Sequence, residues 1–242
     1  MGESMDNFPG DRQDMDAPLD PGVAVSPQLF LRLRNRIVRG ELEPGTRLSE
    51  VDVAAFYSTS RQPVREAFIK LSEAGLIDIR PQRGSFVSRI DVASVLAAQF
   101  VREAVEADIV RAATDRADAD MLAELDGNIA AQESAVDDSD PQAFMALDEA
   151  FHRMIAEIAG QGAGWSFLKS LRTQMDRVRH LSASQFPREI LVRQHRQIVD
   201  AIRAGQADEA EQRMRLHLRR ILDDIPVVAA AKPDFFVTDM SR

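Results

Sequence analysis

Cysteine is absent from this chain of 242 residues, which excludes a disulfide scaffold, a thiolate metal site and a cysteine nucleophile. No apolar run approaches the roughly 20 residues that span a bilayer, so we expect no membrane partner. Residues 1–25 lack the basic and then apolar order of a signal peptide. A cytoplasmic protein is therefore expected. Its 45% hydrophobic and 29% charged residues suit one large or two small globular domains.

The formal net charge of −9 argues against a nucleic-acid partner until the charge is divided along the chain. Residues 1–25 carry −5 and residues 90–242 carry −8, whereas residues 26–89 carry +4, with ten arginines and one lysine. Glycines and prolines interrupt the first segment, which shows no hydrophobic periodicity, so we expect a disordered acidic tail there. Residues 26–89 are the candidate for contact with an anionic partner.

The basic segment has the pattern of three short helices followed by a hairpin. Apolar residues recur three or four positions apart in each helix, and glycines at 40 and 75 are expected to follow the first and third helices. Serine is the expected N-cap of all three helices: Ser26, Ser49 and Ser60. Two short alternating stretches then flank residues 81–84 and predict a pair of strands.

Three helices and a hairpin describe a winged helix-turn-helix. The first turns of its third helix expose Arg61 and Arg65, whose long donors can reach guanine edges and phosphates. Arg83 and Gly84 at the hairpin tip suit close approach to the minor groove or the backbone of DNA. The alternative is a small helical domain with solvated arginines, but the order of the elements favours DNA binding.

Three motifs run through the same segment: PGTRLSE at 44–50, SRQPVREAF at 60–68 and PQRGSFV at 81–87. These motifs resemble the GntR family of bacterial transcription regulators. The resemblance implies double-stranded operator DNA as the partner. It also implies five residues that contact the operator: Ser60, Arg61, Gln62, Arg65 and Gly84.

Residues 90–225 follow a helical pattern throughout, and we expect an all-helical bundle. Breaks divide the segment into about six helices, at roughly 91–115, 118–136, 141–159, 164–184, 187–204 and 206–225. Residues 226–242 are expected to form a C-terminal tail. The predicted fold class is thus mostly α, with an N-terminal winged helix-turn-helix, a small β-hairpin wing and a C-terminal helical bundle.

Three of the four histidines interrupt apolar helix faces that should point into this bundle. Asp148 and His152 are four residues apart and lie on one face of a helix, while His195 and His217 lie in the inward stripes of two later helices. One carboxylate and three imidazoles suit a divalent transition metal, zinc first, with nickel, manganese or iron as alternatives. The spacing equally fits core histidines with satisfied hydrogen bonds.

Arg102 stands in the middle of the apolar stripe of the first long helix. It can form an intrahelical ion pair with Glu106, four residues further on. Alternatively, its guanidinium can clamp the carboxylate of a bound effector.

The DxxFH motif at 148–152, followed by His195 and His217, resembles the FCD effector domain of the FadR branch of the GntR family. This resemblance spans residues 90–225. It implies a metal held by Asp148, His152, His195 and His217, a homodimer formed chiefly through this domain, and Arg102 as an effector ligand.

Together these features predict a ligand-responsive transcription regulator, most simply a repressor, that binds a palindromic operator and senses a small organic acid. A direct sensor of a divalent metal is the first alternative. A metal-dependent hydrolase is the second, but no additional general base has a convincing position and a winged helix would be superfluous. We therefore assign no catalytic residue and expect no enzyme.

Overall fold

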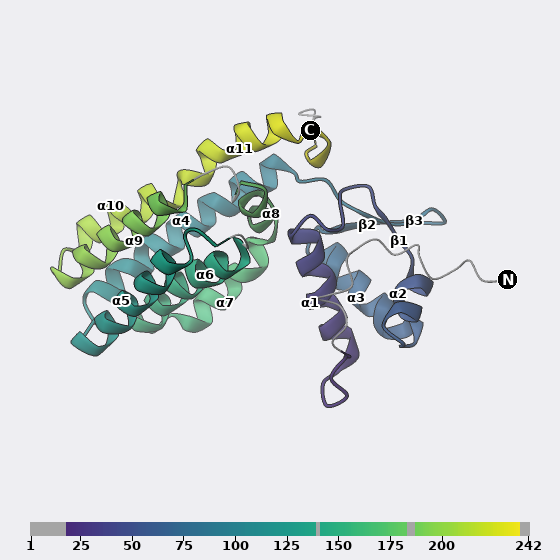
Figure 1. Ribbon diagram of the computed structural model, residues 1–242, viewed down its shortest axis with the longest axis horizontal. Coiled ribbons are helices and arrows are strands. Elements are labelled where there is room, and N and C mark those ends of the chain that lie inside the picture. The colour runs from purple at the N-terminus through teal and green to yellow at the C-terminus, as the bar shows by residue number, and fades with distance from the viewer. Residues whose placement is uncertain (1–17, 139–140, 183–186, 238–242) are drawn as a thin grey trace. The chain divides into compact units, whose positions relative to one another are not determined.

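The computed structural model describes residues 18–138, 141–182 and 187–237. The chain forms two compact units. One runs to Val92 and takes up the chain again from Ala229, and the other comprises Ala93–Val228. Figure 1 shows helices and a small sheet in the first unit and helices in the second, so the predicted fold class is confirmed. None of the described helices combines the length and hydropathy of a membrane span. Residues 1–17 of the expected acidic tail lie outside the described residues.

The first unit contains the three predicted helices and a sheet of three strands, one more than predicted. Its elements are α1 Val25–Val38, β1 Arg47–Leu48, α2 Glu50–Phe56, α3 Arg61–Glu73, β2 Ile77–Arg80 and β3 Gly84–Val87. The antiparallel sheet has the order β1-β3-β2, in which Arg47 pairs with Phe86 and Ile77 with Val87. A two-residue strand is too short to show alternation in the sequence, which is why β1 escaped prediction.

The predicted caps of these helices are right in one case and partly wrong in two. Ser49 accepts a hydrogen bond from the backbone N–H of Asp52 (3.3 Å), as predicted. Ser60 is the N-cap residue of α3, but its side chain makes no capping hydrogen bond. Ser26 lies inside α1, whose N-cap is Ala24. The first four N–H groups of a helix have no intrahelical partner, so Pro27 fits inside the first turn without the loss of a hydrogen bond.

The chain's C-terminal segment is part of the first unit rather than the expected tail. Helix α11 continues to Ala231, and a 3₁₀ turn follows at Pro233–Phe235. The Ile90 N–H donates to the Phe235 carbonyl (2.7 Å), and the Val237 N–H donates to the Ile90 carbonyl (2.9 Å). Ile90 and Phe236 are both buried. Buried apolar side chains and paired backbone groups therefore fasten this segment beside the end of the wing.

We expect Phe236→Ala to destabilise the first unit by about 3–5 kcal/mol, since the change empties the space of a buried phenyl ring. The chain has one tyrosine, Tyr57, and one tryptophan, Trp165, so each unit carries its own optical probe of unfolding. The unfolding midpoint followed by Tyr57 should fall in this variant, whereas the midpoint followed by Trp165 should change less. The control is Val237→Ala, which truncates an exposed neighbour. Equal midpoints for Phe236→Ala and the control would contradict the packing role.

The second unit consists of helices around one large apolar core. Its elements are α4 Val92–Thr114, α5 Ala119–Ser134, α6 Pro141–Ile158, α7 Gly162–Leu171, α8 Thr173–Ser182, α9 Arg188–Arg203, α10 Ala207–Leu218 and α11 Arg220–Ala231. Two of the six predicted helices are each divided in two, at Arg172 and at Arg219. Arg172 donates two hydrogen bonds to Glu149 (2.6 Å each) and lies over the Trp165 ring, which holds the junction of α7 and α8 against α6.

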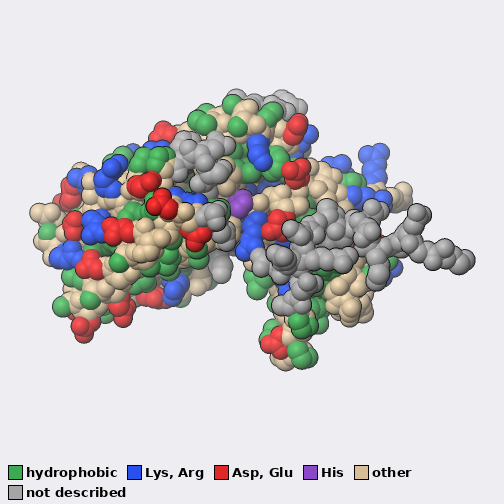
Figure 2. All heavy atoms as spheres, in the orientation of Figure 1, with side chains coloured by type: hydrophobic (Ala, Val, Ile, Leu, Met, Phe, Trp, Pro, Cys, Tyr) green, Lys and Arg blue, Asp and Glu red, His purple; other side chains and the backbone are tan. Residues whose placement is uncertain are grey.

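The surface of the second unit mixes both signs of charge. Figure 2 shows Asp and Glu side chains interspersed with Lys and Arg over the visible face of this unit. Exposed ion pairs account for part of the pattern, among them Arg203 with Asp126 (2.7 Å) and Arg153 with Glu157 (2.9 Å). Each such pair contributes about 0–1 kcal/mol. The determinants of the fold therefore lie in the core rather than on this surface.

Candidate functional site

The four predicted metal ligands come together inside the second unit. Asp148 and His152 lie on α6, His195 on α9 and His217 on α10, and all four are buried. The Nε2 atom of His217 lies 3.2 Å from Nε2 of His195 and 3.2 Å from Nε2 of His152. One ligand atom from each of the four residues lies within 4.8 Å of the others. The spacing in the sequence correctly indicated inward faces, and the packing of three helices makes the faces converge.

A chain of hydrogen bonds fixes the protonation of His195. The Leu147 carbonyl can only accept, so it receives a bond from Asn128 Nδ2 (3.1 Å), and Asn128 Oδ1 accepts from Gln132 Nε2 (2.7 Å). Gln132 therefore presents its oxygen to His195 Nδ1, at 2.7 Å. A neutral imidazole donates from one nitrogen and accepts at the other. Nδ1 of His195 thus carries the proton, and Nε2 presents a lone pair to the cluster.

Acceptors hold the other two imidazoles in the same way. His152 Nδ1 lies 2.7 Å from Glu106 Oε2, and His217 Nδ1 lies 3.1 Å from Gln194 Oε1. Burial raises the pKa of Glu106, but the charges of Arg102 and His152 outweigh burial and lower the pKa to about 2. Acceptor atoms beside the outer ring nitrogen are typical of histidines that bind metals, since they fix the tautomer and the ring orientation.

The electrostatics of the cluster suit a cation. Burial lowers the pKa of His195 to about 3, and burial together with His195 holds the pKa of His217 well below its ordinary value. His195 and His217 are therefore neutral, and each can direct an Nε2 lone pair into the cluster. The Oδ1 atom of Asp148 is buried and accepts no hydrogen bond from the residues that the structure describes, which is unusual for a buried oxygen. This donor set fits a divalent transition metal.

Three residues that contact the predicted ligands escaped the sequence analysis: Arg179, Gln132 and Gln194. Arg179, on α8, forms an ion pair with Asp148 Oδ2. Burial raises the pKa of Asp148, but the charge of Arg179 outweighs burial and holds the pKa well below its usual range. Nothing in the sequence of α8 distinguishes this arginine from its neighbour Arg177. Gln132, however, interrupts the buried stripe of α5, the same signal that indicated the histidines.

A cavity of about 80 Å³ adjoins the cluster, and His217 lines it. Arg102 and Arg179 form part of its polar wall. Its apolar wall comprises Phe144, Met145, Ile190, Leu191, Leu218 and Ile221.

The Nε atom of Arg102 donates to Glu106 Oε1 (2.5 Å), so the predicted intrahelical ion pair exists. Its Nη2 is buried and makes no hydrogen bond within the described residues, which leaves a donor for a bound anion.

The residues predicted to contact DNA gather at two places in the first unit. Ser60, Arg61, Gln62 and Arg65 are exposed at the start of α3, and Arg83 is exposed in the turn of the wing. Arg61 forms an ion pair with Glu50 (3.2 Å), yet two thirds of its side chain remain exposed. The start of α3 therefore presents long donors to solvent.

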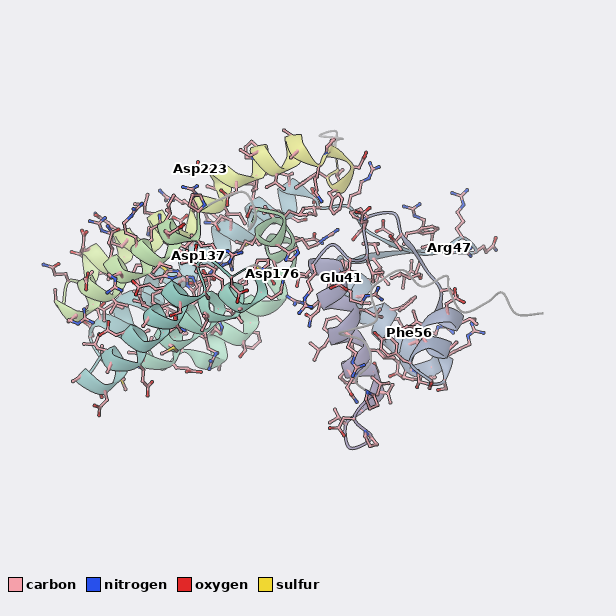
Figure 3. The ribbon with its side chains drawn as sticks, viewed as in Figure 1. Glu41, Arg47, Phe56, Asp137, Asp176 and Asp223 are labelled. Atoms are coloured by element: carbon pink, nitrogen blue, oxygen red, sulfur yellow. The ribbon has the colours of Figure 1, made fainter. Side chains whose placement is uncertain are left out.

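The wing tip also contains an arginine that the sequence analysis missed. Arg47 lies in β1, in the same small sheet as the wing strands, and is labelled in Figure 3. Gly84 has a φ of +107°, and a Cβ atom on it would lie 3.1 Å from Arg47 Nε. Glycine thus fits both the left-handed backbone and the close approach of the guanidinium. Because β1 was not predicted, neither was the position of Arg47 beside the tip.

A winged helix-turn-helix with exposed arginines, followed by a separate helical unit with a buried cavity, is the arrangement of a DNA-binding transcription regulator with a second domain. Comparisons with known proteins agree with this class. Residues 26–87 match the model of bacterial regulatory proteins of the gntR family, and residues 98–220 match the FCD domain. The chain therefore belongs to the GntR family and carries an FCD domain, which makes it a transcription regulator of DNA-binding type and not an enzyme.

Individual relatives cover nearly the whole chain. The HTH-type transcriptional repressor RspR of Escherichia coli (strain K12) is 37% identical over 223 residues, 92% of this chain and 98% of that protein. An HTH-type transcriptional regulator in an unstable DNA locus of Streptomyces ambofaciens is 40% identical over 212 residues, 87% of this chain and 89% of that protein. The solved structure of E. coli McbR/YncC shares the fold, with a TM-score of 0.71 at 17% identity over 86% of this chain and 99% of that one.

Proposed function

We propose that the protein is a repressor that binds a palindromic operator as a homodimer in the cytoplasm and responds to a small organic acid in a metal-dependent pocket. The main support is the position of His217, which belongs to the cluster of four predicted metal ligands and also lines the cavity. Arg102 and Arg179 line the same cavity. The name of the RspR repressor supports repression as the mode of regulation.

Asp148, His152, His195 and His217 are the proposed ligands of a divalent transition metal, with zinc as the first choice for three imidazoles and a carboxylate. Many divalent transition metals that are held by three histidines and one carboxylate have room for a further oxygen ligand from a bound molecule. When bound, the ion would supply a Lewis-acidic position for a carboxylate oxygen. Glu106, Gln132 and Gln194 keep the imidazole lone pairs directed inward.

The effector is proposed to be a small carboxylate. One water occupies about 10–15 Å³ of a cavity, so a cavity of about 80 Å³ accommodates a molecule of a few heavy atoms. Arg102 keeps its orientation through Glu106 and offers Nη2. A guanidinium whose geometry is fixed in advance binds a carboxylate with little further loss of entropy.

The homodimer is proposed to form chiefly through the FCD domain. Helix α4 exposes Leu96 and Phe100, which are four residues apart on one face, and Phe100 is 77% exposed. Apolar side chains that gather on one exposed face are typical of an interface. Two copies of α3 placed about 34 Å apart would read two half-sites of a palindrome, one turn of DNA apart.

The test is the affinity for operator DNA in the presence of organic acids, at constant saturating metal. The proposal requires an acid that weakens operator binding while the metal content of the protein stays the same. A protein whose operator affinity follows the metal concentration and ignores every acid would instead be a direct metal sensor.

Arg65→Ala is expected to weaken specific operator binding by about 1–3 kcal/mol if the side chain reads a base. If Arg65 contacts phosphate, affinity should fall for all sequences and the salt slope should decrease by about one. Titrations of specific and random duplexes at several salt concentrations distinguish these outcomes. Lys70→Ala is the matched control, because Lys70 is an exposed cation in the last turn of the same helix. Wild-type operator affinity in Arg65→Ala would remove α3 as the recognition helix.

A further inference from the structure

The cavity beside the metal ligands contains a carboxylate that the proposed function leaves unexplained. Asp224, on α11, lines this cavity and is 8% exposed. Its Oδ1 atom is buried and accepts no hydrogen bond within the described residues. Arg220, on the same helix, forms an ion pair with this oxygen, at a distance of 3.5 Å from its Nε atom. An acidic group therefore lies inside a pocket that otherwise suits an anion.

The charge of Asp224 is only partly compensated. Burial raises the pKa of this carboxyl, and Arg220 offsets part of that effect. Ser182 also lies in the cavity wall. Its hydroxyl donates to the Arg179 carbonyl (3.0 Å) and also faces Asp224, whose pKa it lowers, so the oxygen of Asp224 that lacks a partner is Oδ1. Buried carboxylate oxygens normally accept a hydrogen bond, so a ligand with a donor at this point would satisfy Asp224. A second carboxylate on the ligand would meet a like charge.

The cavity wall offers a ligand two kinds of polar group. Arg102 and His217 belong to the side that adjoins the metal ligands, while Asp224 and Arg220 come from α11. The other wall residues are largely apolar, with Leu218 and Ile221 among them. A ligand that fits this wall has a carboxylate, an apolar part and a separate polar group.

We propose that Asp224 determines effector specificity, by accepting a hydrogen bond from a hydroxyl or ammonium group that the effector carries in addition to its carboxylate. This inference rests on the proposed function, because it assumes that a carboxylate occupies the Arg102 side of the pocket. It assigns the effector to hydroxy or amino acids rather than to simple fatty acids or dicarboxylic acids.

The experiment is calorimetric titration of the zinc-loaded, full-length protein with matched acids. The first set is butanoate, 4-hydroxybutanoate, 4-aminobutanoate and butanedioate, followed by the same four end groups on chains of three, five and six carbons. At one chain length the hydroxy or the amino acid should bind at least tenfold more tightly than the unsubstituted acid. The dicarboxylate should bind more weakly than that donor-bearing acid.

Variants of Asp224 then show whether this side chain is responsible. Asp224→Ala should remove the preference for a donor. Asp224→Asn should reduce the affinity for the amino acid relative to the hydroxy acid and improve binding of the dicarboxylate, because an amide can donate to it. Asp223→Asn, an exposed neighbour on the same helix, is the matched control. Trp165 fluorescence during unfolding verifies that each variant is folded.

The outcomes separate this inference from the proposed function. If acids bind through Arg102 but the end group has no effect, or if Asp224→Ala keeps the preference, the role of Asp224 is wrong and the carboxylate pocket stands. If no acid of any length binds the zinc-loaded protein, both the pocket assignment and the role of Asp224 are overturned.

Discussion

Removal of the metal is expected to lower the free energy of unfolding of the helical unit by about 4 kcal/mol, if the free ion is first present at about 1,000 times its Kd. The reason is the arrangement of α6, α9 and α10, which direct three imidazoles at one point, with Nε2 of His217 3.2 Å from Nε2 of each of the other two. An ion satisfies these lone pairs and the free Oδ1 of Asp148. Denaturant unfolding followed by Trp165 fluorescence, before chelation, after chelation and after reloading, measures the change.

Variants connect this stability to the cluster. His195→Ala should lose bound metal in elemental analysis and should show little further destabilisation on chelation. His180→Ala is the matched control, because His180 is the one histidine outside the cluster and contacts Gln142. Its metal content should equal that of the wild type. A wild-type protein that takes up no divalent ion after prolonged chelation and reloading would show that the three histidines are core residues.

The sequence was sufficient to place the predicted ligands on buried faces. The apolar residues of each helix recur with the helical period of 3.6 residues, and each histidine occupies a position in that pattern. His195 and His217 occupy positions where Ile or Leu would continue the stripe, and Asp148 and His152 are one turn apart. Their convergence depends on the packing of three helices that are distant in the sequence. Helical periodicity carries no information on that packing, which is why the metal and core interpretations both remained open.

Elsewhere the local rules were overridden by tertiary contacts. The last helix was expected to end at residue 225, and the next residue is Pro226, which lacks the N–H of the intrahelical bond. Helix α11 nevertheless continues to Ala231, with Ile225 and Val228 buried on either side of the proline. Arg179 is the opposite case, because nothing local distinguishes it and only the fold brings it to Asp148. Contacts between residues that are distant in the sequence cannot be predicted from the local pattern of one sequence.

Arg102→Ala is expected to retain the metal and to abolish the effect of the organic acid on operator affinity. The variant removes the free Nη2 donor from the cavity, while Glu106 remains 2.7 Å from His152. The acid should change wild-type operator affinity by about 5–150-fold, the usual range of a coupling free energy of about 1–3 kcal/mol. In Arg102→Ala this factor should fall to one.

The connections of the chain give a physical reason for such coupling. Helix α4 carries Arg102 and begins at Val92, where the DNA-binding unit ends. Helix α11 contributes Arg220 and Ile221 to the cavity, and its residues from Ala229 belong to the DNA-binding unit. An acid that binds to residues of both α4 and α11 therefore acts on two helices that continue into that unit. It can shift the conformational equilibrium only by its differential affinity for the two states.

Reciprocity makes this prediction stringent. If the acid weakens operator binding by a given factor, operator DNA must weaken acid binding by the same factor, and both measurements should respond to Arg102 together. Arg102→Lys keeps a positive charge beside Glu106 but loses the planar fork, so its acid affinity should be intermediate. Arg196→Ala, which removes an exposed arginine paired with Glu133, should behave as the wild type. An acid response that survives in Arg102→Ala would place the effector carboxylate elsewhere, and Arg179 would be the next residue to replace, because it lines the same cavity and already binds a carboxylate.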